Sequence, residues 1–307
     1  WIDAMGFTWE KITYRGSDAA EITGYEGRLP DLEIPEKMEG LPVRSIAAHA
    51  FSGRSDIRSV VLPESLVTMH LFAFYNCPRL ETMELYNSAD DYYDGVIRQC
   101  PLLRTITVRC VQPENYALIR SMLQDVDVTL TFRLLDAQGK ERIKLTFPEY
   151  VNEAKEDTMA RAIHFSIEGA GMAYRECVGK RALDLAGYDR LLGRLTDYDF
   201  DVAARIAFGR LLYPEGLTEQ AEEGYESFLR DNDEKTLRFL IREDEKHSCM
   251  EEIRLMTERS LIGEEGLKTA LEEASELGRS EVCSVLMEYR AQSGSGSGAG
   301  ETLSLDW

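Results

Sequence analysis

The sequence lacks the features that mark several common classes of protein. It has no apolar run near the roughly 18–20 consecutive residues that a membrane-spanning helix needs, so we expect no membrane insertion. None of its six cysteines forms a CxxC pair, whereas zinc and redox sites usually place two thiols within one turn. We therefore predict no bound metal and no disulfide, and we expect the thiols to be free and mostly buried.

Motifs for cofactors are equally scarce. The Gly-rich segment 293–300 has no Lys-Ser or Lys-Thr pair after it, which a phosphate-binding loop requires. Asp197, Asp199 and Asp201 are spaced like the start of a calcium loop, but Val202 and Phe208 stand where such a loop needs Gly and Glu. We interpret the three carboxylates as a helix start, and we predict no cofactor.

Catalytic residues are not evident either. Histidine is rare, and the four copies are scattered: His49, His70, His164 and His247. Only His247 has a cysteine close in sequence, Cys249, and sequence proximity does not bring a base to a nucleophile. The Tyr174–Arg175 pair after a Gly-rich turn predicts either a small groove or a plain junction between elements. We expect a non-enzymatic protein.

The chain has fewer basic than acidic residues. The chain has 35 Lys and Arg against 55 Asp and Glu, a formal charge of -20, and its pI is near 4.7. This balance argues against nucleic acid or an anionic lipid surface as the partner. A length of 307 residues with 44% hydrophobic residues predicts a folded chain of about two domains.

An internal repeat is the strongest pattern in the chain. Ile57, Leu80 and Leu103 stand 23 residues apart. The same step links six further columns: Val60, Met83 and Ile106; Leu62, Leu85 and Val108; Ala50, Ala73 and Val96; Phe51, Phe74 and Ile97; Cys77 and Cys100; Pro78 and Pro101. An earlier unit aligns Leu32 and Ile34 with Val60 and Leu62 at a spacing of 28. The period and the alternating apolar positions predict a solenoid of short strands and turns.

These residues resemble a known family, the BspA-like leucine-rich repeats of bacteria. The resemblance rests on the segments 22–27 (ITGYEG), 32–51 (LEIPEKMEGLPVRSIAAHAF), 60–66 (VVLPESL) and 72–85 (FAFYNCPRLETMEL), and it covers about residues 7–110. It implies a leucine-rich repeat fold that opens with a hairpin cap over residues 7–27, and binding to proteins or surfaces without a shared chemistry. The third unit departs from the pattern, because Gly-Val-Ile replaces the Ala-Phe segment after residues 90–94. We expect that turn to be distorted or functionally altered.

The remaining chain predicts an α+β protein with further parts. Residues 1–112 are the repeat domain with its cap; residues 113–149 are expected to form a helix at 113–123 and a capping hairpin from 126–135 and 140–147. Residues 150–291 show helical spacing, including 158–169, and 270–289 resemble an ankyrin-type helix pair. Residues 292–307 are a Gly/Ser linker and an apolar tail.

The strand residues that alternate with core positions are expected to line the concave face of the solenoid. They are Glu33, Ser59, Val61, Thr82, Glu84, Tyr86, Thr105, Thr107 and Arg109. We predict that this face, the acidic helical domain, or both bind a protein partner. The alternatives are a cell-surface adhesin, if a signal peptide has been removed, and an enzyme with a site hidden among the helices. We expect a cytoplasmic location, with the cell surface or exterior as the alternative.

Overall fold

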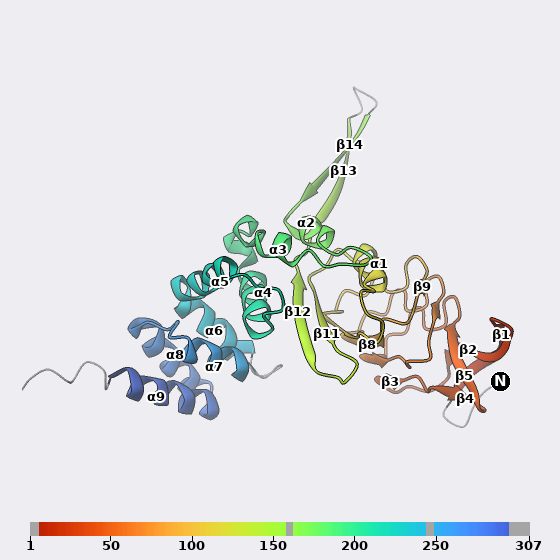
Figure 1. The fold of residues 1–307 in the computed structure, drawn as a ribbon, viewed down its shortest axis with the longest axis horizontal. Helices are drawn as coiled ribbons and strands as arrows, with labels where there is room; N and C mark the ends of the chain where they lie inside the picture. Colours follow the sequence, from red (N-terminus) through yellow and green to blue (C-terminus); the bar gives the residue numbers. More distant parts are fainter. Residues whose placement is uncertain (1–5, 158–161, 244–248, 295–307) are drawn as a thin grey trace, which may run out of the picture. The chain divides into compact units, whose positions relative to one another are not determined.

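The computed structural model describes residues 6–157, 162–243 and 249–294 (Figure 1). The tail predicted after residue 294 and His247 lie outside the described residues. The chain forms two compact units. The first comprises Trp1–Val202 and Tyr213–Gly216, and the second Ala203–Leu212 and Leu217–Trp307. Strands dominate the first unit and helices the second, so the predicted α+β class is confirmed.

Two sheets make up the solenoid of the first unit. The first sheet has the order β1-β2-β5-β7-β9, with β4 paired to β5: β1 (Phe7–Tyr14), β2 (Ser17–Tyr25), β4 (Lys37–Met38), β5 (Leu41–Ile46), β7 (Thr68–Met69) and β9 (Asp91–Tyr92). The second sheet has the order β12-β11-β10-β8-β6-β3: β3 (Asp31–Glu33), β6 (Ser59–Val61), β8 (Thr82–Tyr86), β10 (Thr105–Arg109), β11 (Leu130–Leu135) and β12 (Glu141–Phe147). From β5 to β10 the chain alternates between the two sheets, with one strand in each per turn.

The predicted repeat register is confirmed. Val60 pairs with Met83 and Met83 with Ile106 in parallel strands, and each of these side chains is at most 1% exposed. The Phe51 and Phe74 rings stack with centroids 4.9 Å apart in the core. The Sγ of Cys77 donates to the Phe51 carbonyl oxygen and that of Cys100 to the Phe74 carbonyl oxygen, both at 3.2 Å, so the two thiols occupy equivalent places in successive turns.

The third turn keeps the repeat geometry, so the expected distortion was wrong. The Phe74 amide donates to the Val96 carbonyl oxygen at 2.8 Å, and Val96 and Ile97 are fully buried. Successive turns require a left-handed residue at one corner, filled by His49, Phe72 and Gly95 with φ of 59°, 58° and 72°. Glycine suits the third corner because the Phe72 ring lies where a side chain would begin, and glycine adopts positive φ without a steric cost.

The hairpin predicted as a cap is present, but it extends the second sheet. Strand β11 pairs with β10 in parallel, as one more turn of the solenoid would, and β12 then pairs with β11 antiparallel. Helix α1 (Ala117–Asp125) connects β10 to β11, close to the predicted position. The edge of β12 is covered at Thr146, whose amide donates to the Tyr188 hydroxyl at 3.0 Å while that hydroxyl donates to the Thr146 carbonyl oxygen at 2.6 Å.

The start of the predicted helical domain differs from expectation. Strands β13 (Val151–Asp157) and β14 (Ala162–Glu168) form a separate two-stranded antiparallel sheet, so the helix predicted over 158–169 was wrong, and residues 158–161 lie outside the described residues. Short helices follow in the same unit: α2 (Gly171–Glu176), α3 (Leu185–Asp189) and two 3₁₀ turns (Leu192–Arg194 and Asp197–Asp199). The alternation of Ile163, Phe165 and Ile167 is a strand pattern, which local helical spacing had obscured.

The predicted helices after residue 200 are confirmed. They are α4 (Phe200–Leu212), α5 (Glu219–Asp231), α6 (Asp233–Glu243), α7 (Met250–Glu258), α8 (Glu264–Glu276) and α9 (Ser280–Gly294). Within the second unit, α6 packs on α8, and α9 packs on both α7 and α8. Leu237, Ile253 and Leu286 are fully buried there. Surface ion pairs join the helices: Glu273 accepts from Arg238 at 2.9 Å and from Arg242 at 2.6 Å. The ankyrin-like pairing of residues 270–289 stays a prediction.

Candidate binding surface

The outward side chains of the second sheet form one continuous surface, which we call the strand face. Register aligns them in three rows across the strands. The rows are Asp31, Ser59, Thr82, Thr105 and Thr131, followed by Thr146, which is buried; Glu33, Val61, Glu84, Thr107, Arg133 and Lys144; and Tyr86, Arg109, Leu135 and Glu141. All nine residues predicted from the sequence lie on this face. Their role in binding stays a prediction.

The first row is a ladder of hydroxyl groups. Ser59 donates to Asp31 at 2.8 Å at one end, and the hydroxyls of Thr131 and Thr146 lie 2.9 Å apart at the other. The bonds to Ser59 and Arg58 lower the pKa of the Asp31 carboxyl. Each hydroxyl both donates and accepts, so this row suits a polar partner that needs hydrogen bonds of either kind.

In the third row, Arg109 forms an ion pair that lies beside an aromatic ring. The Nε of Arg109 donates to Glu84 at 2.8 Å, with both side chains about one-third exposed, and the Arg109 guanidinium lies 5.9 Å from the centre of the Tyr86 ring. The bond to Glu84 raises the pKa of the Arg109 guanidinium. Glu84 and Arg109 therefore fix one side of Tyr86, and they reduce the rotamer freedom that a partner would have to remove.

Sequence reasoning missed Thr131 and Arg133, which continue the first two rows on β11. Arg133 pairs with Glu141 at 2.5 Å, and Arg133 is 45% exposed. The signal was present, because Thr131 and Arg133 alternate with the buried Leu130, Phe132 and Leu134. The alternation was interpreted as part of a cap, since nothing in the sequence indicated parallel pairing with β10.

The described histidines and carboxylates that were considered as catalytic or metal-binding residues pack within the repeats, lie in a strand or begin a helix. His49 stacks on Phe72 with ring centroids 5.2 Å apart, and the Nε2 of His70 lies 3.4 Å from Glu21 in the first sheet. His164 lies in β14. Asp199 accepts hydrogen bonds from the Thr196 amide and hydroxyl at 2.9 and 2.8 Å, which confirms the predicted helix-start carboxylate. Within the described ranges, no group of three or more His, Cys, Asp or Glu side chains is placed to hold a metal ion.

Tyr174 and Arg175 form a junction rather than a groove. Arg175 is 6% exposed, and its guanidinium donates to the carbonyl oxygens of Pro148, Gly171 (3.1 Å) and Val128 (2.8 Å). Burial lowers the pKa of Arg175 to about 10. Tyr174 is fully buried against Tyr188, with ring centroids 4.8 Å apart. Both side chains tie α2 to the strands before it, and neither is open to a ligand.

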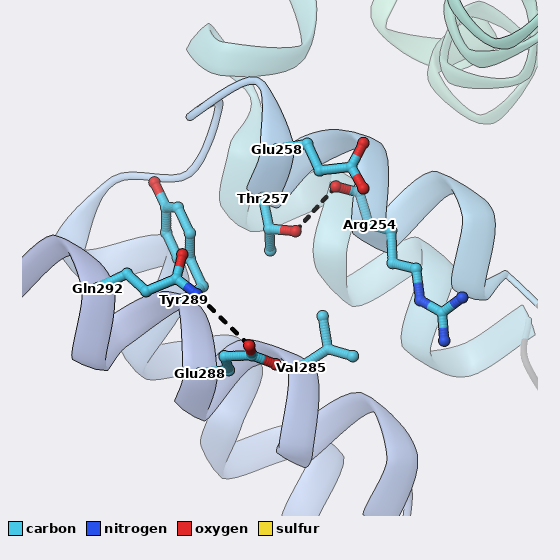
Figure 2. Close-up of a pocket in the computed structure, with 7 residues that line it drawn as sticks. All are labelled: Arg254, Thr257, Glu258, Val285, Glu288, Tyr289 and Gln292. Carbon is cyan, nitrogen blue, oxygen red and sulfur yellow. Dashed lines mark hydrogen bonds between the residues drawn. The ribbon is translucent and has the colours of Figure 1, made fainter.

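The helical unit has a shallow hollow of about 250 Å³ between α7 and α9 (Figure 2). Arg254, Thr257 and Glu258 line one side, and Val285, Glu288, Tyr289 and Gln292 line the other. The Thr257 hydroxyl donates to the Arg254 carbonyl oxygen of its own helix at 2.8 Å. The Tyr289 hydroxyl donates to the carbonyl oxygen of Ile262, in the connection between α7 and α8, at 3.1 Å, so both hydroxyls already have acceptors within the protein. This arrangement is an ordinary surface groove between helices. Among the described helices, none has the length and apolar character needed to cross a membrane.

Comparisons with known proteins agree with the fold of the first unit. Residues 25–137 match the family model of the BspA type leucine rich repeat region, in six copies. A leucine-rich repeat protein of T. pallidum is 20% identical over 34% of this chain and 70% of its own, with a TM-score of 0.25. One from Bacteroides ovatus is 16% identical over 36% of this chain and 49% of its own, with a TM-score of 0.23. No curated protein matches the chain.

Proposed function

Because residues 25–137 are a leucine-rich repeat region of the BspA type, we propose that this protein is a non-enzymatic interaction scaffold that binds a protein partner through its strand face. Solenoids commonly bind through the extended surface that their repeats create. The repeat family supports a protein-interaction or surface-associated role in general. The specific surface is our inference from the side chains.

The arrangement around Tyr86 supports this proposal most directly. Tyrosine offers a large contact area with few rotatable bonds and is enriched at binding hot spots. Here its ring lies beside an ion pair that is itself only partly exposed. The other rows of the strand face carry exposed Thr82 and Val61, which is 37% exposed, so apolar, hydroxyl and charged groups occur together on this face, as in a protein interface.

A pair of substitutions on the strand face tests the proposal. Tyr86→Ala with Thr82→Lys removes the ring and places a long charged side chain in the hydroxyl row. We expect the folding of the protein to change little, because exposed substitutions usually cost below about 0.5 kcal/mol. Capture of its strongest partner from a lysate, quantified by mass spectrometry, should weaken at least tenfold, which corresponds to about 1.4 kcal/mol.

The matched control carries Tyr93→Ala with Glu10→Lys, which likewise removes a tyrosine ring and introduces a lysine, but directly after β9 and on β1 of the first sheet. Tyr93 is 46% exposed and Glu10 is exposed, so folding should again be preserved. Equal capture by the wild type and the strand-face variant would contradict the proposal. Loss of capture only after charge reversal on α5 to α9 would instead assign the function to the acidic helices.

An adhesin-type role at a cell surface is the alternative that the repeat family also supports. The strand face would then bind a partner outside the cell. Labelling intact cells with an antibody against the solenoid distinguishes this location from the cytoplasmic one. An enzyme with a site among the helices is the remaining alternative, and nothing in the described helices favours it over binding.

A further inference from the structure

A groove of about 410 Å³ crosses the side of the solenoid, at the corner where the chain passes from the second sheet to the first. We call it the lateral groove. Tyr14 and Arg15 at the turn of the β1–β2 hairpin line its first end. The rest of the lining comes from successive turns of the chain and comprises Pro42, Arg44, Glu64, Val67, Ser88, Asp90 and Gln112. It is separate from the strand face, whose residues do not line it.

The repeat stacks a cation, an apolar residue and an anion along this groove. Arg44, Val67 and Asp90 stand 23 residues apart, in the same place of successive turns. The Val67 amide donates to the Arg44 carbonyl oxygen at 3.0 Å, and the Asp91 amide donates to the Val67 carbonyl oxygen at 3.1 Å. Parallel chains hydrogen-bonded in this way are about 4.8 Å apart, so the Arg44 and Asp90 backbones are separated by roughly 9.5 Å.

Both charges retain unused hydrogen-bonding capacity. Arg44 donates one N–H to the Ser65 carbonyl oxygen at 2.9 Å, and across the described residues it has no carboxylate partner. Asp90 is exposed and accepts from the Asn115 amide group at 3.1 Å, which leaves its second carboxylate oxygen for a ligand. Two other acids line the groove. Asp18 is engaged by Lys11 at 2.6 Å, and among the described residues Glu64 forms no ion pair with Arg44.

A further cation, Arg15, lies at the first end of the groove in a left-handed backbone conformation. Arg15 has φ of 50° and precedes Gly16 with φ of 82°, the left-handed pair of a tight hairpin turn that usually carries Asn or Gly. Its guanidinium lies 5.2 Å from the centre of the Tyr14 ring. The left-handed conformation is unfavourable for arginine, and here the turn holds the guanidinium beside an aromatic ring at the mouth of the groove.

The spacing of the two charges selects the conformation of an occupant. Residues i and i+3 of an α-helix lie only about 4.5 Å apart along its axis, which is shorter than the separation of roughly 9.5 Å between the Arg44 and Asp90 backbones. An extended strand fits, but its residues i and i+3 point to opposite sides. A polyproline II segment has three residues per turn and a rise of about 3.1 Å, so residues i and i+3 lie on one side, about 9.3 Å apart.

We propose that the lateral groove binds a polyproline II segment of a partner protein with oppositely charged residues at positions i and i+3. The acidic side chain pairs with Arg44, where Arg15 adds to the attraction, and the basic side chain pairs with Asp90. The two residues between them contact Val67, with Pro42 and Tyr14 beside it. Aromatic and apolar side chains line grooves that bind such segments in other proteins. This is a second binding site, distinct from the one proposed on the strand face.

Fluorescein-labelled synthetic peptides test the spacing with the full-length protein. The probe contains Glu-Pro-Pro-Arg flanked by Pro and Gly, and its matched controls place the charges two or four residues apart. Anisotropy at low salt should show the three-residue spacing binding at least threefold more tightly than either control. Equal binding of the three peptides would overturn the proposed conformation, and absence of binding by all of them would overturn the site.

Charge exchange in the groove tests the pairing. Arg44→Glu replaces the cation opposite Asp90 by an acid, so it should weaken binding of Glu-Pro-Pro-Arg at least fivefold and favour Arg-Pro-Pro-Arg. Asp90→Arg, at an exposed position, should favour Glu-Pro-Pro-Glu instead, and it keeps the test decisive if Arg44→Glu fails to fold. Unchanged preference in a folded variant contradicts the proposal. The Tyr86→Ala, Thr82→Lys variant should bind the peptides normally, so failure of one site is distinguishable from failure of the other.

Discussion

Phe74 occupies the most regular position of the repeat, and its stability contribution can be predicted. Its side chain is fully buried and stacks on Phe51. Phe74→Ala should lower the free energy of unfolding by about 3–5 kcal/mol, because the solenoid cannot collapse to fill the space without shifting neighbouring turns. Leu71→Ala, three residues earlier at a side chain that is 42% exposed, should cost less than about 1 kcal/mol. Urea denaturation measures both, and equal costs would mean that the register is misassigned.

The cysteines differ in the environment of their thiols, which predicts their reactivity. Burial raises the pKa of Cys110 and of Cys177 to about 11, from an ordinary value of 9.0. At pH 8 each should therefore react with iodoacetamide at least tenfold more slowly than an exposed cysteine, because the thiolate is the nucleophile. Peptide mass spectrometry after timed alkylation measures this at each site. Under non-reducing denaturing conditions we expect all six thiols to titrate, and loss of two would indicate a disulfide.

The raised pKa values of Cys110 and Cys177 also make the stability of the protein depend on pH. A folded-state pKa above the unfolded value means that the protonated thiol is favoured in the native protein. The stabilisation that each protonated thiol gives the folded protein is complete below about pH 9 and is lost as pH rises towards 11. Replacement of both cysteines by serine should flatten the fall in stability between these values. An unchanged pH profile would assign that fall to other groups.

Helix α1 ends the regular turns, and one carboxylate at its last residue joins it to them. Asp125 accepts from the Tyr92 hydroxyl at 2.6 Å, the Gly95 amide at 3.0 Å and Arg98 at 3.3 Å. Burial and the neighbouring Asp125 raise the pKa of Tyr92 well above its ordinary value. Asp125→Ala should therefore destabilise the protein by about 3 kcal/mol, since it leaves buried donors without an acceptor. Asp127→Ala, an exposed acid two residues later, is the control in thermal unfolding followed by circular dichroism.

At the level of elements, the sequence predicted what repeats or alternates locally. The residues spaced 23 apart predicted the strands and the core of the solenoid, because each turn buries side chains at the same positions as the turn before it. The parallel pairing of β11 with β10 was missed because it depends on how the α1 connection returns the chain. The lateral groove was missed for a similar reason: the turn at Arg15 and the ladder at Arg44, Val67 and Asp90 are joined by folding and share no sequence motif.

At the level of the whole molecule, two cores divide the chain, since the solenoid and the helices bury separate sets of side chains. Trp9 is 3% exposed and lies in the hairpin at the start of the solenoid, whereas most helical residues lie in the second unit. In a Trp1→Phe, Trp307→Phe background, tryptophan fluorescence therefore reports the first unit and circular dichroism at about 222 nm reports chiefly the second. Units with separate cores need not unfold together.

We expect the two signals to change at different urea concentrations. Phe74→Ala should move the fluorescence midpoint and leave the main circular dichroism transition in place. Leu237→Ala, at a fully buried position of α6, should do the reverse. Coincident transitions that both substitutions shift equally would instead show a single cooperative unit. In that case the helices would stabilise the solenoid directly, and substitutions on them would alter partner binding through folding rather than through contact.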